Sequence, residues 1–249
     1  MRCILLAVLW PTCLWVLATP TVSQSAPQIV KGWGDVTDPD GNCKVTVDGG
    51  KVTISMPGGQ HDLWPEKNKT GKVNAPRILQ SVEGDFVVTV KVTGAIKPQK
   101  GTMVPKLGSG GPFQGGCLLI WQDENTFMRF DRCGVYSASK DKNLAFFYLQ
   151  AFKDTKRVTD KESKKVINLF KEGQLDEDGY LRLERKKGKV YPSFSQDGGK
   201  TWLVLAPPSV STDLPQKVKV GVGAVNNTTK AFSVQFQDFE VKKLAKRGN

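Results

Sequence analysis

The sequence predicts an all-β fold, a sandwich or barrel of antiparallel strands. From residue 28 onward, short runs of β-branched and aromatic residues alternate with Gly, Asp, Asn and Pro, a pattern typical of antiparallel β-structure. No segment shows the period of a long helix. Hydrophobic residues make up 39% of the 249 positions and charged residues 24%, which is the composition of a folded protein with a substantial core.

The first 26 residues are predicted to be a secretory signal peptide. Arg2 precedes two apolar runs, no charged residue follows before Lys31, and small residues stand at 23, 25 and 26, as expected for a leader and its cleavage site. An uncleaved anchor is the alternative, but Pro11 and the polar stretch 19–25 interrupt the roughly 20 apolar residues that a span requires. We therefore expect a secreted or periplasmic protein with no membrane span after cleavage.

Strands of the first half are predicted from their alternation and from the turns between them. Gly49-Gly50 and the acidic segment 123–125 are turn sequences of hairpins. In the run 86–92, one Phe and three Val occupy every second position, so their side chains share one face. The predicted strands are 44–48, 52–56, 86–92, 117–121 and 127–131.

The second half predicts further strands after one irregular stretch. Residues 155–171 fit neither the strand period nor the helix period, and seven Lys or Arg lie between 153 and 171, so we expect a solvated excursion there. No linker and no internal repeat of about 20–50 residues interrupts the chain. Residues 27–249 are therefore expected to form one domain. The predicted strands of this half are 180–184, 189–194, 201–205, 218–222 and 232–241.

Three phrases of the sequence resemble one known group of proteins. They are Asn-Ala-Pro-Arg-Ile-Leu-Gln-Ser-Val-Glu-Gly-Asp-Phe at 74–86, Cys-Leu-Leu-Ile-Trp-Gln-Asp-Glu-Asn at 117–125, and 180–185 with the turn 195–202. These phrases are similar to the uncharacterised concanavalin A-like domains that include the fungal enolase-regulation proteins and many secreted bacterial proteins. The resemblance implies a two-sheet jelly roll with one concave face, and it implies no catalytic residues. The loop 95–112 and the basic insertion 153–171 depart from it.

Charge and histidine content limit the partners of the protein. The chain carries a formal charge of +12 and one histidine, His61. The charge favours anionic partners such as sulfated or carboxylated polysaccharide, and no nucleic-acid motif accompanies it. One histidine excludes two-His zinc sites, and the acidic turns 38–42 and 176–179 lack the full ligand spacing of a calcium loop. We expect no nucleic acid, no metal and no cofactor.

Three cysteines remain after the leader, at positions 43, 117 and 133. In an oxidising compartment this odd number permits one disulfide and leaves one thiol. Cys117 and Cys133 flank the predicted hairpin, and a slip of one residue in strand register would put them on opposite faces. The sequence leaves this disulfide open.

Alternation in several strands predicts a polar and aromatic face that suits a glycan. In 180–184 the leucines point to the core, and in 127–131 Met128 and Phe130 do so, which turns Arg and carboxylate side chains to the other face. Aromatic rings pack on the C–H faces of sugars, and fixed Arg, Asp and Glu groups hydrogen-bond their hydroxyls. An ordinary cross-strand charge ladder is the structural alternative. The candidate ligand contacts are Trp121, Arg129, Asp131, Arg182, Glu184 and Tyr191.

Two other function classes stay open beside a non-catalytic glycan-binding protein. A glycoside hydrolase needs two carboxyls about 5–9.5 Å apart, and Asp131 with Glu184 is the best candidate pair. The closely spaced acidic triad of concanavalin-like glucanases is absent, so no catalytic residue is assigned. The third class is an envelope scaffold that binds other proteins.

Two motifs have both a structural and a functional interpretation. His61, with Asp62 and Trp64, is either the edge of a binding site or a turn residue that caps backbone groups. The segment 195–202 matches the Asp-box of sialidases. Because it occurs once and contains the Asp-Gly-Gly sequence of a tight turn, it predicts a hairpin connection.

Overall fold

The computed structural model describes residues 28–65, 70–105, 107, 111–159, 167–205, 209–211 and 213–245. Within these ranges the regular structure is entirely β-strand and forms two antiparallel sheets. The predicted fold class, an all-β two-sheet concanavalin A-like jelly roll, is confirmed. The expected leader 1–26 lies outside the described ranges, and no helix among the residues described could cross a membrane.

Sheet A contains nine of the described strands in the order β1-β2-β5-β16-β7-β8-β9-β10, with β11 also paired to β9. The long central strands β7 and β8 form the predicted hairpin. The bounds are β1 (Ile29–Val30), β2 (Gly34–Thr37), β5 (Arg77–Glu83), β7 (Phe113–Asp123), β8 (Thr126–Ser137), β9 (Lys142–Lys153), β10 (Lys156–Arg157), β11 (Asn168–Gly173) and β16 (Lys217–Asn226).

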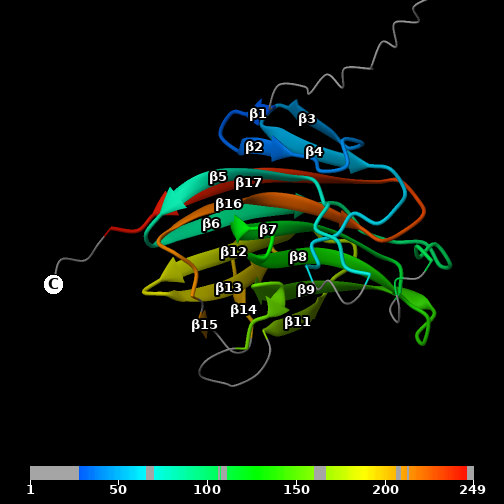
Figure 1. Cartoon of the computed structure of the whole chain (residues 1–249). Helices are drawn as coiled ribbons and strands as arrows, with labels where there is room; N and C mark the ends of the chain where they lie inside the picture. Colours follow the sequence, from blue (N-terminus) through cyan, green and yellow to red (C-terminus); the bar gives the residue numbers. More distant parts are fainter. Residues whose placement is uncertain are drawn as a thin grey trace, which may run out of the picture.

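Sheet B contains eight described strands in the order β14-β13-β12-β6-β17-β4-β3, with β15 also paired to β13. Figure 1 shows β1 to β4 along one side of the molecule and β11, β14 and β15 along the opposite side. The bounds are β3 (Lys44–Asp48), β4 (Lys51–Met56), β6 (Phe86–Thr93), β12 (Gly179–Lys186), β13 (Lys189–Ser195), β14 (Leu203–Val204), β15 (Val210–Ser211) and β17 (Phe232–Lys243).

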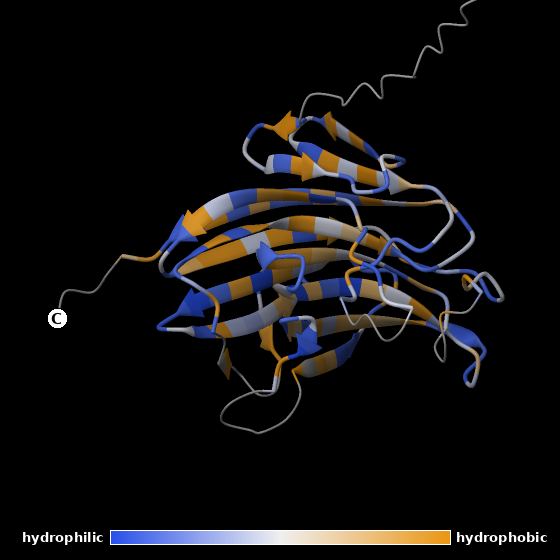
Figure 2. Cartoon of the chain, in the orientation of Figure 1, coloured by the Kyte–Doolittle hydropathy of each residue, from blue (hydrophilic) through white to orange (hydrophobic). Residues whose placement is uncertain are grey.

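The main core lies between the two sheets. Alternate residues of each strand point inward, for example Val88 and Val90 of β6 and Leu118 and Ile120 of β7, and all four are fully buried. Figure 2 shows the resulting alternation of hydrophobic and hydrophilic positions along several strands. Burial of these side chains, at about 25 cal/mol per Å² of apolar area, is the main stabilising contribution to the sandwich.

A second apolar cluster lies on the other face of sheet A, which we call the outer face. The segments 61–65 and 70–75 pack over part of this face, so apolar residues are buried there as well. Sheet A is therefore covered on both faces near these segments. The cluster consists of Leu63, Ala75, Leu79, Cys117, Leu119, Trp121, Phe127, Phe152 and Val225.

Most predicted strands are present, and the differences have a physical reason. The sequence does not predict β9, because its apolar residues face both the core and the outer cluster and hide the period of two. The stretch 155–171 is only partly a solvated excursion, since it contains β10 and the start of β11. The predicted strand 201–205 shortens to β14.

Strand register settles the possible Cys117–Cys133 disulfide. Cys117 is opposite Asp131 and Cys133 is opposite Gly115, so the two cysteines are diagonal neighbours about 7–8 Å apart, beyond the geometry of a disulfide. Both are buried free thiols, and Cys43 is a half-buried free thiol.

We expect none of these thiols to react readily in the native protein. Burial raises the pKa of both Cys117 and Cys133, and burial with the nearby Asp38 carboxylate raises the pKa of Cys43 to about 12, so little thiolate forms at pH 8. Titration with a chromogenic disulfide should detect three thiols in the unfolded, unreduced chain from residue 27. Detection of one thiol would contradict the observed register.

Candidate functional site

A hollow of about 240 Å³ opens on the outer face of sheet A, beside the segment 61–65. Strands β8 and β9 form its floor, and three loops contribute its walls. This volume is below the roughly 300 Å³ at which pockets for drug-sized ligands begin. The hollow therefore suits a small unit of a larger ligand. Its lining residues are Asp62, Trp64, Gly111, Phe113, Arg129, Val135, Tyr148, Gln150 and Asn227.

Cross-strand register places the floor residues. Because side chains alternate along β8, Met128 and Phe130 enter the core while Arg129 and Asp131 point to the outer face. Arg129 is opposite Gln150 of β9, and Asp131 is opposite Tyr148. The floor is thus a patch of polar groups set beside the apolar outer cluster.

Arg129 is the centre of a buried charge network. Its Nε donates to both oxygens of Asp131, at 3.2 Å to Oδ1 and 3.0 Å to Oδ2, and its Nη2 donates to Oδ2 at 2.7 Å. Its Nη1 donates to Asp62 Oδ1 at 3.0 Å and to the Leu63 carbonyl at 3.1 Å. The Arg129 side chain is 2% exposed and that of Asp131 is fully buried, whereas the Asp62 side chain is 26% exposed. Of these groups, Asp62 is the carboxylate that reaches the hollow.

Burial and ion pairing have opposite effects on the pKa values of Arg129 and Asp131. Burial alone would lower the pKa of Arg129, but Asp131 and Asp62 raise it above its ordinary value, so the guanidinium stays charged. Burial raises the pKa of Asp131, and the hydrogen bonds from Arg129 oppose that rise. Buried pairs of this kind fix geometry more than they add stability.

The segment 61–64 forms one wall, and its backbone is anchored at several points. His61 pairs with Asn226 through backbone hydrogen bonds, and Asn74 Oδ1 accepts from the Asp62 N–H at 3.0 Å. Trp64 is half-buried, packs edge-on against Phe152 and lies under the guanidinium of Arg157, whose Cζ is 4.6 Å from its ring centroid. The wall is thus a rigid support for one indole ring.

The opposite wall joins the start of β7 to the segment after β16. The Phe113 N–H donates to Asn227 Oδ1, and the Asn227 N–H donates to the Phe113 carbonyl at 3.0 Å. The Phe113 ring centroid is 5.9 Å from Arg129 Cζ. A second ring therefore borders the charged network, and the half-buried Tyr148 supplies a third.

The structure divides the six predicted ligand contacts between the two sheets. Arg129 lines the hollow and Asp131 lies directly behind it. Trp121 is on the same face but only 5% exposed, stacked on Phe127 and covered by Arg77, whose Cζ is 4.5 Å from the ring. The other three residues are in sheet B. The expectation of one shared face is therefore wrong.

Arg182, Glu184 and Tyr191 lie on the outer face of sheet B. Glu184 and Tyr191 are cross-strand neighbours and border a shallow depression with three lysines, at positions 186, 187 and 189. Arg182 stacks on Trp202, with its Cζ 3.5 Å from the ring centroid. The residues that line the depression include one aromatic ring, that of Tyr191, beside Glu184 and the three lysines.

The proposed carboxyl pair is also divided between the sheets. Asp131 points outward from sheet A and is fully buried beneath Arg129, whereas Glu184 points outward from sheet B. The apolar core lies between them. Two carboxyls on opposite sides of the sandwich cannot flank one glycosidic bond, so the assignment of Asp131 and Glu184 to hydrolysis is wrong.

Strand alternation in the sequence could not predict the other residues that line the hollow. Asp62 and Trp64 reach the hollow, while their neighbour His61 is buried with its Nε2 3.1 Å from Asn42 Oδ1. Tyr148 lies on the unpredicted strand β9. Phe113 and Asn227 lie at strand ends, where only the tertiary fold brings them together. Tyr148 and Gln150, two residues apart in the otherwise apolar run 144–152, were the signal for a polar floor.

Within the described ranges, the remaining motifs have structural roles. Asp197 accepts hydrogen bonds from the N–H and hydroxyl of Thr201 and from the Ser195 hydroxyl, and these bonds lower its pKa. The Asp-box therefore closes a turn. Asp38 Oδ2 accepts from the Cys43 N–H at 2.7 Å. No group of three or more His, Cys, Asp or Glu within the described ranges could hold a metal ion.

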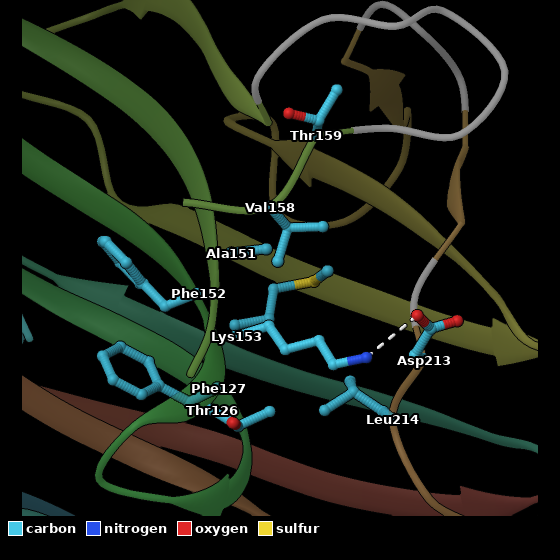
Figure 3. A pocket seen from close by; sticks show the side chains of 10 residues that line it. Thr126, Phe127, Ala151, Phe152, Lys153, Val158, Thr159, Asp213 and Leu214 are labelled. Atoms are coloured by element: carbon cyan, nitrogen blue, oxygen red, sulfur yellow. Dashed lines mark hydrogen bonds and ion pairs between the residues drawn. The ribbon is translucent and has the colours of Figure 1, made fainter. Parts of the chain in front are cut away.

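A smaller cavity lies between the edge of sheet A and the segment around Asp213. Figure 3 shows its mostly apolar lining and the ion pair between Lys153 and Asp213, whose Nζ and Oδ2 are 3.1 Å apart. Its volume is about 60 Å³, room for about two waters at roughly 30 Å³ each. It is too small to receive a sugar.

Comparisons with known proteins support the fold. No family model matches the chain, and no curated protein matches it. A functionally unknown protein from Saccharomyces cerevisiae superposes with a TM-score of 0.60 at 14% identity, over 86% of this chain and 98% of that chain. A xylan β-1,4-xylosidase from Bacillus halodurans superposes with a TM-score of 0.51 at 14% identity, over 88% of this chain and 38% of that chain.

A third similar structure leads to the same conclusion. The GH43 protein BlXynB from Bacillus licheniformis has a TM-score of 0.53 at 14% identity, and the match covers 88% of this chain and 38% of that chain. This chain therefore spans well under half the length of the xylosidase and of the GH43 protein. At such low identity these likenesses establish the two-sheet β-sandwich fold.

Proposed function

We propose that this protein is a secreted or periplasmic, non-catalytic carbohydrate-binding β-sandwich, and that the hollow on sheet A holds the sugar. The observation that carries the proposal is the arrangement of Trp64, Phe113 and Tyr148 around the fixed Asp62–Arg129–Asp131 network. Sugar recognition needs rings for the C–H faces and immobile polar groups for the hydroxyls. The partial likeness of the fold to a xylan β-1,4-xylosidase is consistent with this function.

The charges at the hollow favour a neutral glycan. Asp62 and Asp131 are two negative charges against the single positive charge of Arg129, so the network has a net charge of −1. A sulfated or carboxylated sugar would be repelled by Asp62, the exposed member. Arg157, over Trp64, adds one positive charge beside this network. The rest of the overall charge of +12 is carried elsewhere, and binding of anionic polysaccharide by those lysine-rich surfaces stays a separate prediction.

The lining residues support binding rather than hydrolysis. Glycoside hydrolysis needs two carboxyls on either side of the scissile bond. Among the residues that line the hollow, Asp62 supplies the one carboxylate that reaches it. The oxygens of Asp131 are engaged by Arg129 and fully buried. We therefore expect saturable binding without release of sugar.

Replacing Trp64 with alanine should lower affinity for a neutral oligosaccharide by about tenfold or more, because a rigid aromatic wall would be lost. The Tyr191→Ala protein is the matched control, since Tyr191 is a half-buried ring on the outer face of sheet B. A screen of neutral, carboxylated and sulfated polysaccharides first identifies a ligand. Calorimetric titration at low and high salt then measures the affinity of each variant.

The outcomes separate the function classes. Binding that survives high salt, weakens in Trp64→Ala and is unchanged in Tyr191→Ala supports the proposal. Equal loss in both variants would move the site away from sheet A. Binding that disappears with salt would indicate attraction to basic surfaces, release of sugar would indicate an enzyme, and a protein partner without glycan binding would indicate a scaffold.

A further inference from the structure

A row of side chains crosses sheet A and leads out of the hollow. Cys117 of β7 is opposite Asp131 of β8, which is opposite Tyr148 of β9, which is opposite Phe170 of β11. Paired residues in an antiparallel sheet point to the same face. The row therefore runs from the buried Asp131, through Tyr148 in the hollow, to Phe170 beside it.

Phe170 is an exposed ring with a neighbouring ring. It is 65% exposed, and it is the one aromatic side chain among the exposed large hydrophobic residues of the described ranges. Phe146 of β9 packs edge-on against it, with ring centroids 5.9 Å apart. Phe146 is on the same strand as Tyr148, and Phe170 lies one strand beyond it, at the spacing of about 4.8 Å between adjacent strands.

The size and position of the Phe146–Phe170 pair indicate which kind of ligand binds there. Two rings are far smaller than the roughly 800 Å² per partner that a stable protein interface buries. Phe170 continues the cross-strand row of the floor, and Phe146 lies on the same face two residues before Tyr148 on β9. The exposed ring of Phe170, held edge-on by Phe146 next to a sugar-sized hollow, suits the C–H face of the next sugar unit.

We propose that Phe146 and Phe170 form a second sugar subsite, so that the protein binds an extended neutral oligosaccharide running from the hollow across β9 to β11. This inference rests on the proposed function and adds a preference for chain length. One sugar unit fills the hollow, while a longer ligand also covers the rings. Affinity therefore rises with length, and Phe170 is responsible for that rise.

The test compares glucose, xylose and mannose with the cello-, xylo- and manno-oligosaccharides of six units. The native protein should bind the best hexasaccharide about tenfold more tightly than the corresponding monosaccharide. In Phe170→Ala this length preference should disappear while monosaccharide affinity stays unchanged. Phe170→Tyr should keep the preference. Leu203→Ala, which removes a side chain 54% exposed on β14 of sheet B, should behave as the native protein does.

Each result supports or overturns the inference. A hexasaccharide preference that persists in Phe170→Ala, with Trp64→Ala still weakening both lengths, overturns the second subsite and leaves the proposed function intact. Loss of monosaccharide affinity in Phe170→Ala also overturns it, because Phe170 would then belong to the hollow. Failure of the native protein to bind any of these probes overturns both proposals.

Discussion

Replacing Arg129 with methionine is expected to lower the free energy of unfolding by about 3–5 kcal/mol at pH 7. The substitution leaves Asp131, which is fully buried, without the guanidinium that bonds both of its oxygens. It also removes the anchor of Asp62 and of the Leu63 carbonyl. Urea unfolding followed by tryptophan fluorescence measures the change, and sugar binding should be lost with it.

The loss of unfolding free energy in Arg129→Met should depend on pH in a defined direction. Burial raises the pKa of Asp131 above its ordinary value of 3.8, and without Arg129 nothing opposes that rise. A carboxyl whose pKa is raised by folding favours the folded state below the unfolded pKa, and that stability is lost as pH rises through the folded pKa. The variant should therefore be closer to the native protein at pH 4 than at pH 7.

The control removes both charges together. In Arg129→Met with Asp131→Leu no buried carboxylate is left unpaired, and replacing a buried pair by apolar residues is often nearly neutral. We expect the double variant to recover most of the lost stability and to lose the pH dependence, while sugar binding stays absent. A double variant less stable than Arg129→Met would show that Asp131 contributes through other contacts.

Replacing Arg132 with methionine is expected to cost about 2–3 kcal/mol. Arg132 is fully buried, and its Nη2 donates to the carbonyls of Gln174, Leu175 and Glu177 at 3.2, 3.0 and 2.9 Å. One side chain thus holds the connection between β11 and β12. Hydrogen exchange should increase in residues 167–178, which include the strand of Phe170.

Arg185→Met is the matched variant in the other sheet. Arg185 is 2% exposed and donates to the carbonyls of Leu214 and Pro215 at 2.9 and 2.7 Å. We expect a loss of stability of similar size, with faster exchange confined to residues near 213–216. If both variants accelerate exchange throughout the molecule, the two arginines stabilise the whole sandwich rather than single connections.

Sequence patterning predicted the fold well because strand alternation is a local property. The strand 44–48 was predicted with the bounds of β3, and the alternation of 86–92 is the core face of β6. Strand β9 could not be predicted, because Phe147 and Leu149 face the core while Phe152 joins the outer cluster. Burial on both faces removes the contrast on which the period of two depends.

The site was predicted in part for the same reason. Alternation in 127–131 placed Arg129 and Asp131 on the side away from the core, where the structure has them. Alternation in 180–184 likewise placed Arg182 and Glu184 away from the core, but the outer faces of the two sheets lie on opposite sides of the sandwich. Whether two strands belong to one sheet depends on pairing between distant residues, which no local pattern contains.

By itself, the sequence determined the all-β class, the main hairpin and the direction of individual side chains, since these follow from short-range sterics and hydrophobic alternation. The tertiary structure alone decided which sheet each strand joined and that Cys117 and Cys133 remain free thiols. It also gathered Asp62, Phe113 and Tyr148 at one hollow. Those contacts join segments far apart in the chain, and only the packing of two complete sheets fixes them.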